Sequence, residues 1–202
     1  MIIDHAGKSP SIATTARIAP GAVVCGDIAI GENTSVGFGA ILTAESGPIE
    51  IGRNCVIMDT AVLRGVRGSP LRIADNVLVG PRAYLTGCII EEDVFLATGA
   101  TVFNGSIIGR GAEVRINGIV HIRTVLPEGA IVPLGWIAIG NPAQILPPEK
   151  HDEIWAIQRE LNFPKHVWGV ERRPDGQSLM PDIMSRYAAA LRRWHEKDRQ
   201  IS

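Results

Sequence analysis

Few aromatic residues, no long apolar run and almost no net charge mark this sequence. Aromatic residues make up 5% of the 202 positions, which is little for a globular core built around rings. The 20 basic and 21 acidic residues leave a net charge of -1, so nothing indicates a nucleic acid or another polyanion as partner. No stretch of eighteen apolar residues occurs, and we therefore expect no membrane-spanning segment.

Cysteine is also scarce. Cys25, Cys55 and Cys88 are odd in number and scattered, which favours free thiols in a reducing compartment over a disulfide framework. The first ten residues have neither a basic start nor a long apolar stretch, so a secretory signal is not expected there. We therefore expect a cytoplasmic protein.

What the sequence does contain is an aliphatic residue at every sixth position, with two insertions and one short step of five residues from Leu85 to Ile90. A period of six fits neither a helix of about 3.6 residues per turn nor the alternation of an ordinary strand. It fits triangular coils with one short strand and one inward aliphatic residue per side. The positions are Ile18, Val24, Ile30, Val36, Ile51, Ile57, Ile73, Val79, Leu85, Ile90, Leu96, Val102, Ile108, Val114, Val120 and Leu126.

Turn-forming residues mark the corners of these coils. Neighbouring layers are only about 4.8 Å apart, so a corner needs small side chains and unusual backbone angles. The segments Gly31-Glu32-Asn33 and Ala74-Asp75-Asn76 supply such residues. The period breaks at residues 43–50 and again at 64–72. Because it resumes after each break, we expect both insertions to be loops that leave one corner, where repeat proteins often bind ligands.

The repeat ends near position 143, and the composition then changes. We predict a β-helix domain over residues 1–145 and a helical extension over residues 146–202 that packs on it, with a loop containing Pro164 between two amphipathic helices. The predicted helices carry Ile154, Ile157 and Leu161 in the first and Ile183, Tyr187, Leu191 and Trp194 in the second. We expect them to pack along the coil, cap its open end and reinforce contacts between copies; a partner-binding helix is the alternative.

Several segments together resemble the gamma-class carbonic anhydrase family. They are GDIAIGENTSVGFGAIL, GPIEIGRNCVIMDTAVLRG, IADNVLVGPRAYLTGCIIEEDVFLATGATV and IAIGNPAQI. The similarity as a whole covers about two-thirds of the chain. The resemblance implies a left-handed parallel β-helix, a C-terminal helix along it and a homotrimer. It also implies active sites between subunits, where three histidines from two neighbouring subunits hold a catalytic zinc or iron ion.

The three positions that match the family's histidines carry other residues. Arg64 stands after the run that begins with Ile57-Met58-Asp59, Pro81 stands in Val79-Gly80-Pro81, and Thr86 stands in Leu85-Thr86-Gly87-Cys88. Met58 replaces the family's glutamine, and Glu45 stands at the family's interface aspartate. Asp59 alone of that polar set is kept.

These substitutions predict that the site holds no metal and that the protein has no cofactor. Zinc needs three or four His, Cys or carboxylate ligands at about 2.0–2.3 Å, which arginine, proline and threonine do not supply. Without a metal, no Lewis acid lowers the pKa of bound water, and carbonic anhydrase activity by the usual route is not expected.

His121 is the repeat-region histidine that remains to be explained. It follows Val120 as Thr86 follows Leu85, so Thr86, Phe103 and His121 should lie on one edge in successive layers. At the usual strand spacing His121 is then roughly 10 Å from Thr86, too far to share a metal with that position. His121 is either a surface or interface residue or a catalytic base.

The altered cleft is expected to bind a small anionic molecule. Arg64 and Arg82 suit a carboxylate, bicarbonate or phosphate. The predicted binding residues are Arg64, Arg82, Tyr84, Thr86, Met58 and Pro81, and the predicted acid or base residues are Glu45, Asp59 and His121. The alternative is that Arg64 pairs with Glu45 or Asp59 and closes the site as part of the interface.

Three functions remain open. The first is a metal-free trimer that binds or transforms a small anion, by lyase, isomerase or thioester chemistry if it is an enzyme. The second is a non-catalytic scaffold or assembly subunit. The third is an acyltransferase that uses an acyl-CoA donor, for which His121 is the available base. The fold alone does not decide among them.

Overall fold

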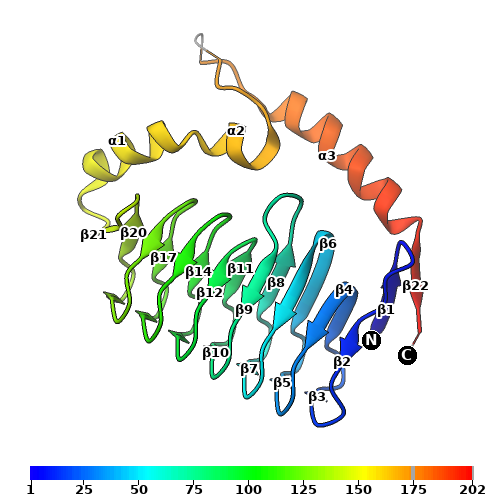
Figure 1. Cartoon of the computed structure of the whole chain (residues 1–202). Helices are drawn as coiled ribbons and strands as arrows, with labels where there is room; N and C mark the ends of the chain where they lie inside the picture. The colour runs from blue at the N-terminus through cyan, green and yellow to red at the C-terminus, as the bar shows by residue number, and fades with distance from the viewer. Residues whose placement is uncertain (174–175, 202) are drawn as a thin grey trace.

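The structure, a computed structural model, describes residues 1–173 and 176–201. Its main body is a stack of coils in which each short strand pairs in parallel with a strand of the next coil (Figure 1). In the regular part the partners lie eighteen residues apart, as Ile90 with Ile108 and Val102 with Val120 do. Three six-residue sides per coil explain that spacing, so the predicted parallel β-helix of hexapeptide repeats is confirmed.

One side of each coil contributes to a seven-stranded sheet. Its strands are β3 (Arg17–Ile18), β5 (Ser35–Val36), β7 (Val56–Ile57), β10 (Leu78–Val79), β13 (Phe95–Leu96), β16 (Glu113–Val114) and β19 (Ile131–Val132). The other two sides belong to a single fifteen-stranded sheet, because β4 (Val23–Ile30) and β6 (Ile41–Ile51) run through the corner between them.

That larger sheet covers a second and a third side. The second side holds β2 (Ser11–Ile12), β9 (Leu71–Ile73), β12 (Ile89–Ile90), β15 (Ile107–Ile108) and β18 (Val125–Leu126). The third side holds β1 (Ile2–His5), β8 (Val62–Gly65), β11 (Tyr84–Thr86), β14 (Thr101–Val102), β17 (Ile119–Val120) and β20 (Ile137–Ile139), with β21 (Gln144–Leu146) antiparallel to β20.

After β21 the chain returns along the outside of the coil (Figure 1). It forms α1 (His151–Leu161), α2 (Phe163–Trp168), α3 (Met180–His195) and β22 (Asp198–Gln200), and β22 pairs antiparallel with β1. Residues 174, 175 and 202 of the predicted extension lie outside the described residues. The expected loop at Pro164 is wrong: this proline occupies the first turn of α2, where its missing N–H costs no hydrogen bond.

The aliphatic series forms the core inside the coil. Every predicted position from Val24 to Leu126 is at most 4% exposed, and Val132 and Ala138 continue the series in the last coil. Ile18 is only partly buried because the first coil lacks a neighbour on one side. Each layer thus buries the inward side chains of the next. This burial of apolar surface between layers is the main source of stability in a solenoid.

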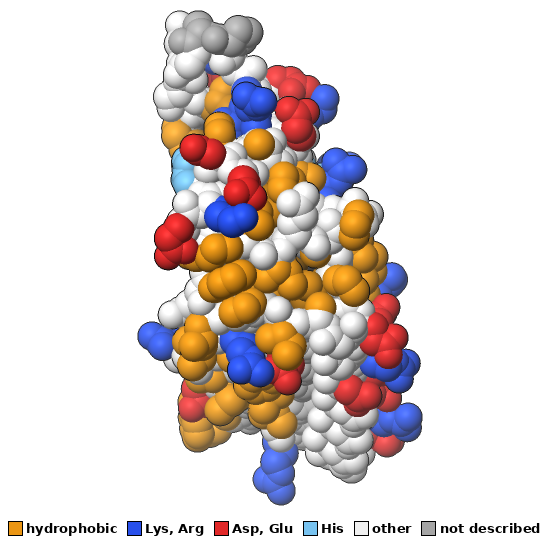
Figure 2. Space-filling view, turned by 90° about the vertical axis from the view of Figure 1, so that its left-hand side faces the viewer, with side chains coloured by type: hydrophobic (Ala, Val, Ile, Leu, Met, Phe, Trp, Pro, Cys, Tyr) orange, Lys and Arg blue, Asp and Glu red, His pale blue; other side chains and the backbone are white. Residues whose placement is uncertain are grey.

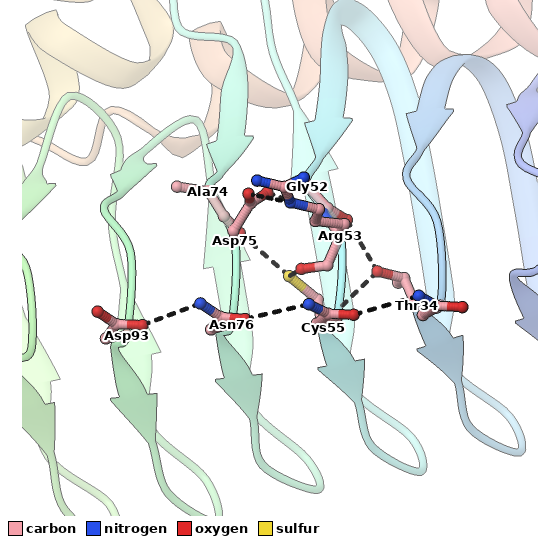
Figure 3. A network of polar contacts seen from close by, with 10 residues as sticks. Thr34, Gly52, Arg53, Cys55, Ala74, Asp75, Asn76 and Asp93 are labelled. Carbon is pink, nitrogen blue, oxygen red and sulfur yellow. Dashed lines mark hydrogen bonds and ion pairs between the residues drawn. The ribbon is translucent and has the colours of Figure 1, made fainter.

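Polar side chains form a ladder along one corner (Figure 3). The amide of Asn76 donates to Asp93 at 3.1 Å, and Asn54 donates to Asn76 at 3.4 Å. These three residues have φ between 56° and 63°, a left-handed conformation that Asn and Asp tolerate better than other side chains. Beside them the Thr34 hydroxyl donates to the Gly52 carbonyl at 2.8 Å. The corner residues therefore hydrogen-bond to one another between layers and also adopt the backbone angles that the turns require.

The two insertions differ in structure, although both lie at the corner between the third and second sides. In the insertion at 64–72, the residues between β8 and β9 form a loop, as expected. An antiparallel bridge between Val66 and Ser69 closes this loop. Residues 43–50 are not a loop: they stay inside the eleven-residue strand β6. The irregularity is absorbed in the pairing with β4, whose register shifts between Gly26 and Ile28.

The last coil is covered in part by α1, which lies against β20. Figure 2 views this end and shows hydrophobic side chains gathered across it. The last coil also leaves Ile131 and Leu134 on the surface, at 45% and 62% exposure. No helix within the described residues is both long enough and apolar enough to cross a membrane.

Leu85→Ala tests the stacked core. Leu85 is fully buried at the middle of the stack, and we expect its truncation to lower the free energy of unfolding by about 2–5 kcal/mol because the layers leave a cavity. Ile131→Ala removes a similar volume from an exposed site and should cost under about 1 kcal/mol. Equilibrium unfolding in urea measures both, and similar losses for the two variants would contradict the assignment of the core.

Candidate functional site

A cavity of about 570 Å³ lies between the third side of the coil and the helices α2 and α3. The coil contributes residues from β6, β8 and β11, and the two helices close the opposite wall. The residues most relevant to its chemistry are Glu45, Arg64, Tyr84, Thr86, Trp168 and Tyr187. In the single chain the expected cleft around Arg64 is thus covered by the protein's own helices.

Arg64 is the central polar group of this cavity. Its backbone pairs with Thr43 on one side and Thr86 on the other, and this register directs the guanidinium outward from the coil. The guanidinium forms an ion pair with Glu45 and donates to the hydroxyl of Tyr187 at 2.9 Å. A longer contact of 3.4 Å joins it to the Tyr84 hydroxyl. The ion pair is the one expected under the alternative in which Arg64 pairs with Glu45 or Asp59, and Glu45 is the partner.

These partners keep Arg64 charged despite its burial. Burial by itself lowers the pKa of the guanidinium, but the hydrogen bonds with Tyr187, Tyr84 and Glu45 and the charge of Glu45 raise it above its ordinary value. The side chain of Arg64 is 23% exposed and that of Glu45 is 18% exposed, so the pair is only partly screened by water.

The cavity lining as a whole is positive. Arg67 and Arg186 join Arg64, and Glu45 is the acidic residue among the lining residues that the structure describes. His166 also lies in the wall, and burial together with the charge of Arg123 lowers its pKa, so it adds no positive charge near neutral pH. Three arginines against one carboxylate leave a field that attracts anions.

Aromatic rings form the rest of the wall. The ring of Phe103 lies 6.0 Å from that of Phe163, and Phe163 packs edge-on against Trp168 at 5.2 Å. Tyr84 and Phe103 are in contact at 6.3 Å between ring centroids. An apolar wall with a few placed polar groups is typical of a small-molecule pocket.

Sequence reasoning missed the helical half of this cavity. Trp168, Arg186 and Tyr187 lie more than a hundred residues after Arg64, and no spacing in the sequence connects them. The concentration of three of the four tryptophans after position 150 was the available signal.

Four predicted site residues lie elsewhere in the chain. Met58 and Asp59 precede β8, while Arg64 lies near its end, so a strand separates them. Pro81 and Arg82 stack on the same corner, where the Arg82 amide donates to the Asp59 carbonyl at 3.2 Å. The Asp59 carboxylate accepts from the Phe38 amide at 2.8 Å and is no partner of Arg64. Within one chain these residues do not join the cavity.

Thr86 lies in the cavity wall, whereas His121 does not. The register places Phe103 and His121 in the two layers after Thr86, as predicted. His121 is 7% exposed, its ring contacts Phe103 and Phe163, and its Nε2 lies 3.0 Å from the amide nitrogen of Gln158. Its Nδ1 has no hydrogen-bond partner among the described residues.

The donor set around Arg64 does not fit a zinc or iron ion. Arginine carries no free lone pair at neutral pH. Among the cavity-lining residues that the structure describes, the usual zinc donors are Glu45 and His166, fewer than the three or four that a zinc ion needs. Among the described residues of a single chain, the one group of three His, Cys, Asp or Glu side chains with suitable spacing lies at another place, around His5.

The burial of His121 predicts a pH dependence of stability. Burial lowers the pKa of His121 to about 4, while an unfolded histidine titrates near about 6.5. The unfolded state takes up the proton first as the pH falls, so the contribution of the neutral ring is complete above about pH 6.5 and is lost toward about pH 4. Over that range we expect the wild type to lose up to about 3 kcal/mol more than His121→Phe in equilibrium unfolding. If the free energy of unfolding changed equally with pH in the wild type and in His121→Phe, this expectation would be contradicted.

Comparisons with known proteins agree with the geometry of the coil. A profile of the hexapeptide repeat of succinyl-transferase matches residues 27–58 and 70–104. Gamma carbonic anhydrase 2, mitochondrial, of Arabidopsis thaliana is 31% identical over 158 residues, which are 75% of this chain and 55% of that protein. The chain therefore spans only about half the length of that relative.

Two further matches extend over most of both chains. The carbonic anhydrase of Geobacillus kaustophilus is 31% identical over 159 residues, which are 79% of this chain and 84% of that protein. A crystal structure from Bacillus cereus, provisionally assigned as an acetyltransferase, has a TM-score of 0.53 and 28% identity and covers 76% of this chain and 87% of that one. The protein belongs to the hexapeptide-repeat family and has gamma carbonic anhydrases among its homologues.

Proposed function

We propose that this protein is a gamma carbonic anhydrase-like homotrimer that binds a small organic anion in the Arg64 cavity and lacks the family's catalytic metal. The observation that carries the proposal is the excess of arginine over carboxylate in a cavity of about 570 Å³. The trimer follows from the family resemblance.

The ligand that fits this cavity has a carboxylate and an apolar or aromatic body. Arginine presents paired donors that match the two oxygens of a carboxylate. Tyr187 and Tyr84 hold the Arg64 guanidinium in place, which reduces the entropy lost when a ligand binds. Phe103, Phe163 and Trp168 offer ring faces for the rest of the molecule.

The absence of the family metal is the second part of the proposal. Arg64, Pro81 and Thr86 stand where the resemblance places three histidines. Arg64 also brings a permanent positive charge, which repels a cation from the position it occupies. The same replacement that removes a metal ligand therefore supplies an anion-binding group.

Glu45 is the candidate acid or base if the bound anion reacts. It lines the cavity and touches Arg64, so an incoming carboxylate competes with it for the guanidinium. Displacement of Glu45 would leave a carboxylate beside the ligand, where it can accept or donate a proton. His121 is separated from this position by aromatic packing.

The binding part is tested by calorimetry with benzoate, acetate, bicarbonate and acetyl-CoA as probes. We expect benzoate to bind more tightly than acetate or bicarbonate, because it uses the aromatic wall as well as the charge. Arg186→Ala and Arg64→Ala should each weaken benzoate binding by about 10- to 100-fold, the usual range for one charged hydrogen bond.

The matched control is Arg72→Ala, because Arg72 is exposed and pairs with Glu50 on another side of the coil. It should leave benzoate binding unchanged. Thermal unfolding of each variant shows whether it is folded. Folded Arg186→Ala with wild-type affinity, or no carboxylate binding by the wild type, contradicts the proposal; tight binding of acetyl-CoA alone supports the acyltransferase alternative.

The metal part is tested by the rate of CO2 hydration. After saturation with zinc, we expect the protein to hydrate CO2 no faster than the same buffer with zinc, in a stopped-flow assay with a pH indicator. The reason is that positions 64, 81 and 86 provide no ligand set for a catalytic ion. Rapid hydration that disappears in Thr86→Ala or Arg64→Ala would show that a metal works at this site.

A further inference from the structure

A second group of chemically active side chains lies where the two ends of the chain meet. Strand β1 pairs in parallel with β4, with Ile3 opposite Cys25. It pairs antiparallel with β22 on its other edge, with His5 opposite Asp198. Figure 1 shows β1 and β22 side by side, although almost the whole sequence separates them. Three strands thus bring an imidazole, a thiol and a carboxylate together.

The distances within this group suit a shared ligand. One potential ligand atom from each of His5, Cys25 and Asp198 lies within 4.8 Å of the other two. The Nδ1 of His5 is 2.5 Å from one oxygen of Asp198. The Nδ1 of His195, at the end of α3, is 2.9 Å from the other oxygen. The side chains of His5, Cys25 and Asp198 converge on this point, and His195 contacts the group through Asp198.

Three of these side chains are at least half-buried, and the fourth, His195, is exposed. The side chains of His5 and Asp198 are 11% and 24% exposed, and Cys25 is half-buried, while the side chain of His195 is 70% exposed. Buried polar side chains need partners. The hydrogen bond between His5 and Asp198 satisfies two of them and leaves the Cys25 thiol beside them without a strong partner of its own.

Charge around the thiol favours a cation. Burial first, and then the carboxylates of Asp198, Asp4 and Glu45, raise the pKa of Cys25 to about 11. The free thiol is therefore protonated and a poor nucleophile, which argues against a catalytic Cys–His–Asp arrangement. The same negative surroundings attract a divalent cation, which lowers the cost of forming a thiolate.

We propose that His5, Cys25 and Asp198 bind a zinc ion, with His195 as the partner that orients Asp198. Nitrogen, sulfur and oxygen donors together suit zinc, whose bonds of about 2.0–2.3 Å place tetrahedral ligand atoms about 3.3–3.8 Å apart. The His5–Asp198 contact opens by about 1 Å to admit the ion, and the proton between them is lost to solvent, so that Nδ1 of the neutral His5 ring can bind zinc. Cys25 releases its thiol proton to solvent, and the thiolate sulfur donates an electron pair to zinc.

A metal at this place fastens the C-terminal segment to the first coil. Asp198 belongs to β22 and His195 ends α3, while His5 and Cys25 belong to the coil. Helix α3 also carries Tyr187, which contacts Arg64 in the cavity. Zinc binding therefore stabilises the helix that closes the cavity, and it is independent of whether the cavity binds an anion.

The test uses the full chain after treatment with a chelator and dialysis. Zinc titration should show one tight equivalent per chain, and cobalt as a probe should give the near-ultraviolet charge-transfer absorption of a thiolate–cobalt bond. Cys25→Ser should abolish that absorption and weaken zinc binding at least 10-fold. Asp198→Asn should weaken zinc binding to a similar extent while it preserves the shape of the side chain.

Two controls separate this site from adventitious binding. Cys55→Ser removes a thiol that lies at another corner of the coil, and His151→Asn removes an exposed histidine. Both should bind zinc like the wild type, and zinc should raise the melting temperature of the wild type but not of Asp198→Asn. Less than a tenth of an equivalent bound to the wild type, or unchanged cobalt absorption in Cys25→Ser, overturns the proposal.

Discussion

The stacking of six-residue sides at strand spacing is the constraint on which the rest of the structure depends. Because adjacent layers are about 4.8 Å apart, each inward position must carry an aliphatic side chain that fills one layer only. Leu63, Leu85 and Val102 satisfy this in three successive coils and are fully buried. The same spacing places outward residues in columns. Arg64 and Thr86 are neighbours in adjacent layers for this reason, and their side chains therefore line the same cavity.

The helices turn one outward column into a cavity. A flat side of a β-helix exposes its outward residues to water, where an arginine–glutamate pair contributes little. Tyr187 from α3 and the rings of α2 cover Arg64 and Glu45, so the pair acts in a less polar environment. The cavity lining then carries more arginine than carboxylate, and the rest of its wall is partly apolar. This combination supports the proposed role in binding an organic anion. The carbonic anhydrases that are 31% identical to this chain match it over 75% and 79% of its length.

The return of the chain to its starting point has a separate consequence. Strand β22 adds to the edge of β1 and protects an edge that would otherwise be open. It also carries Asp198 to His5 and Cys25, which none of the family motifs includes. The segment that contains α3 and β22 therefore contributes to both sites. It covers the Arg64 cavity through Tyr187 and supplies Asp198 to the candidate metal site.

The coil can be predicted from the sequence alone, because a period of six leaves no other regular arrangement for Val24 through Leu126. The sequence also predicted the column of Thr86, Phe103 and His121, since register follows from counting sides. It left Glu45 and Asp59 open as alternative partners of Arg64. The tertiary structure decided what local spacing does not encode. It placed Tyr187 over Arg64, kept Asp59 away from it and joined His5 to Asp198. The contacts of Tyr187 and Asp198 depend on where the C-terminal segment lies on the coil, and that is set by side-chain packing across more than a hundred residues of chain.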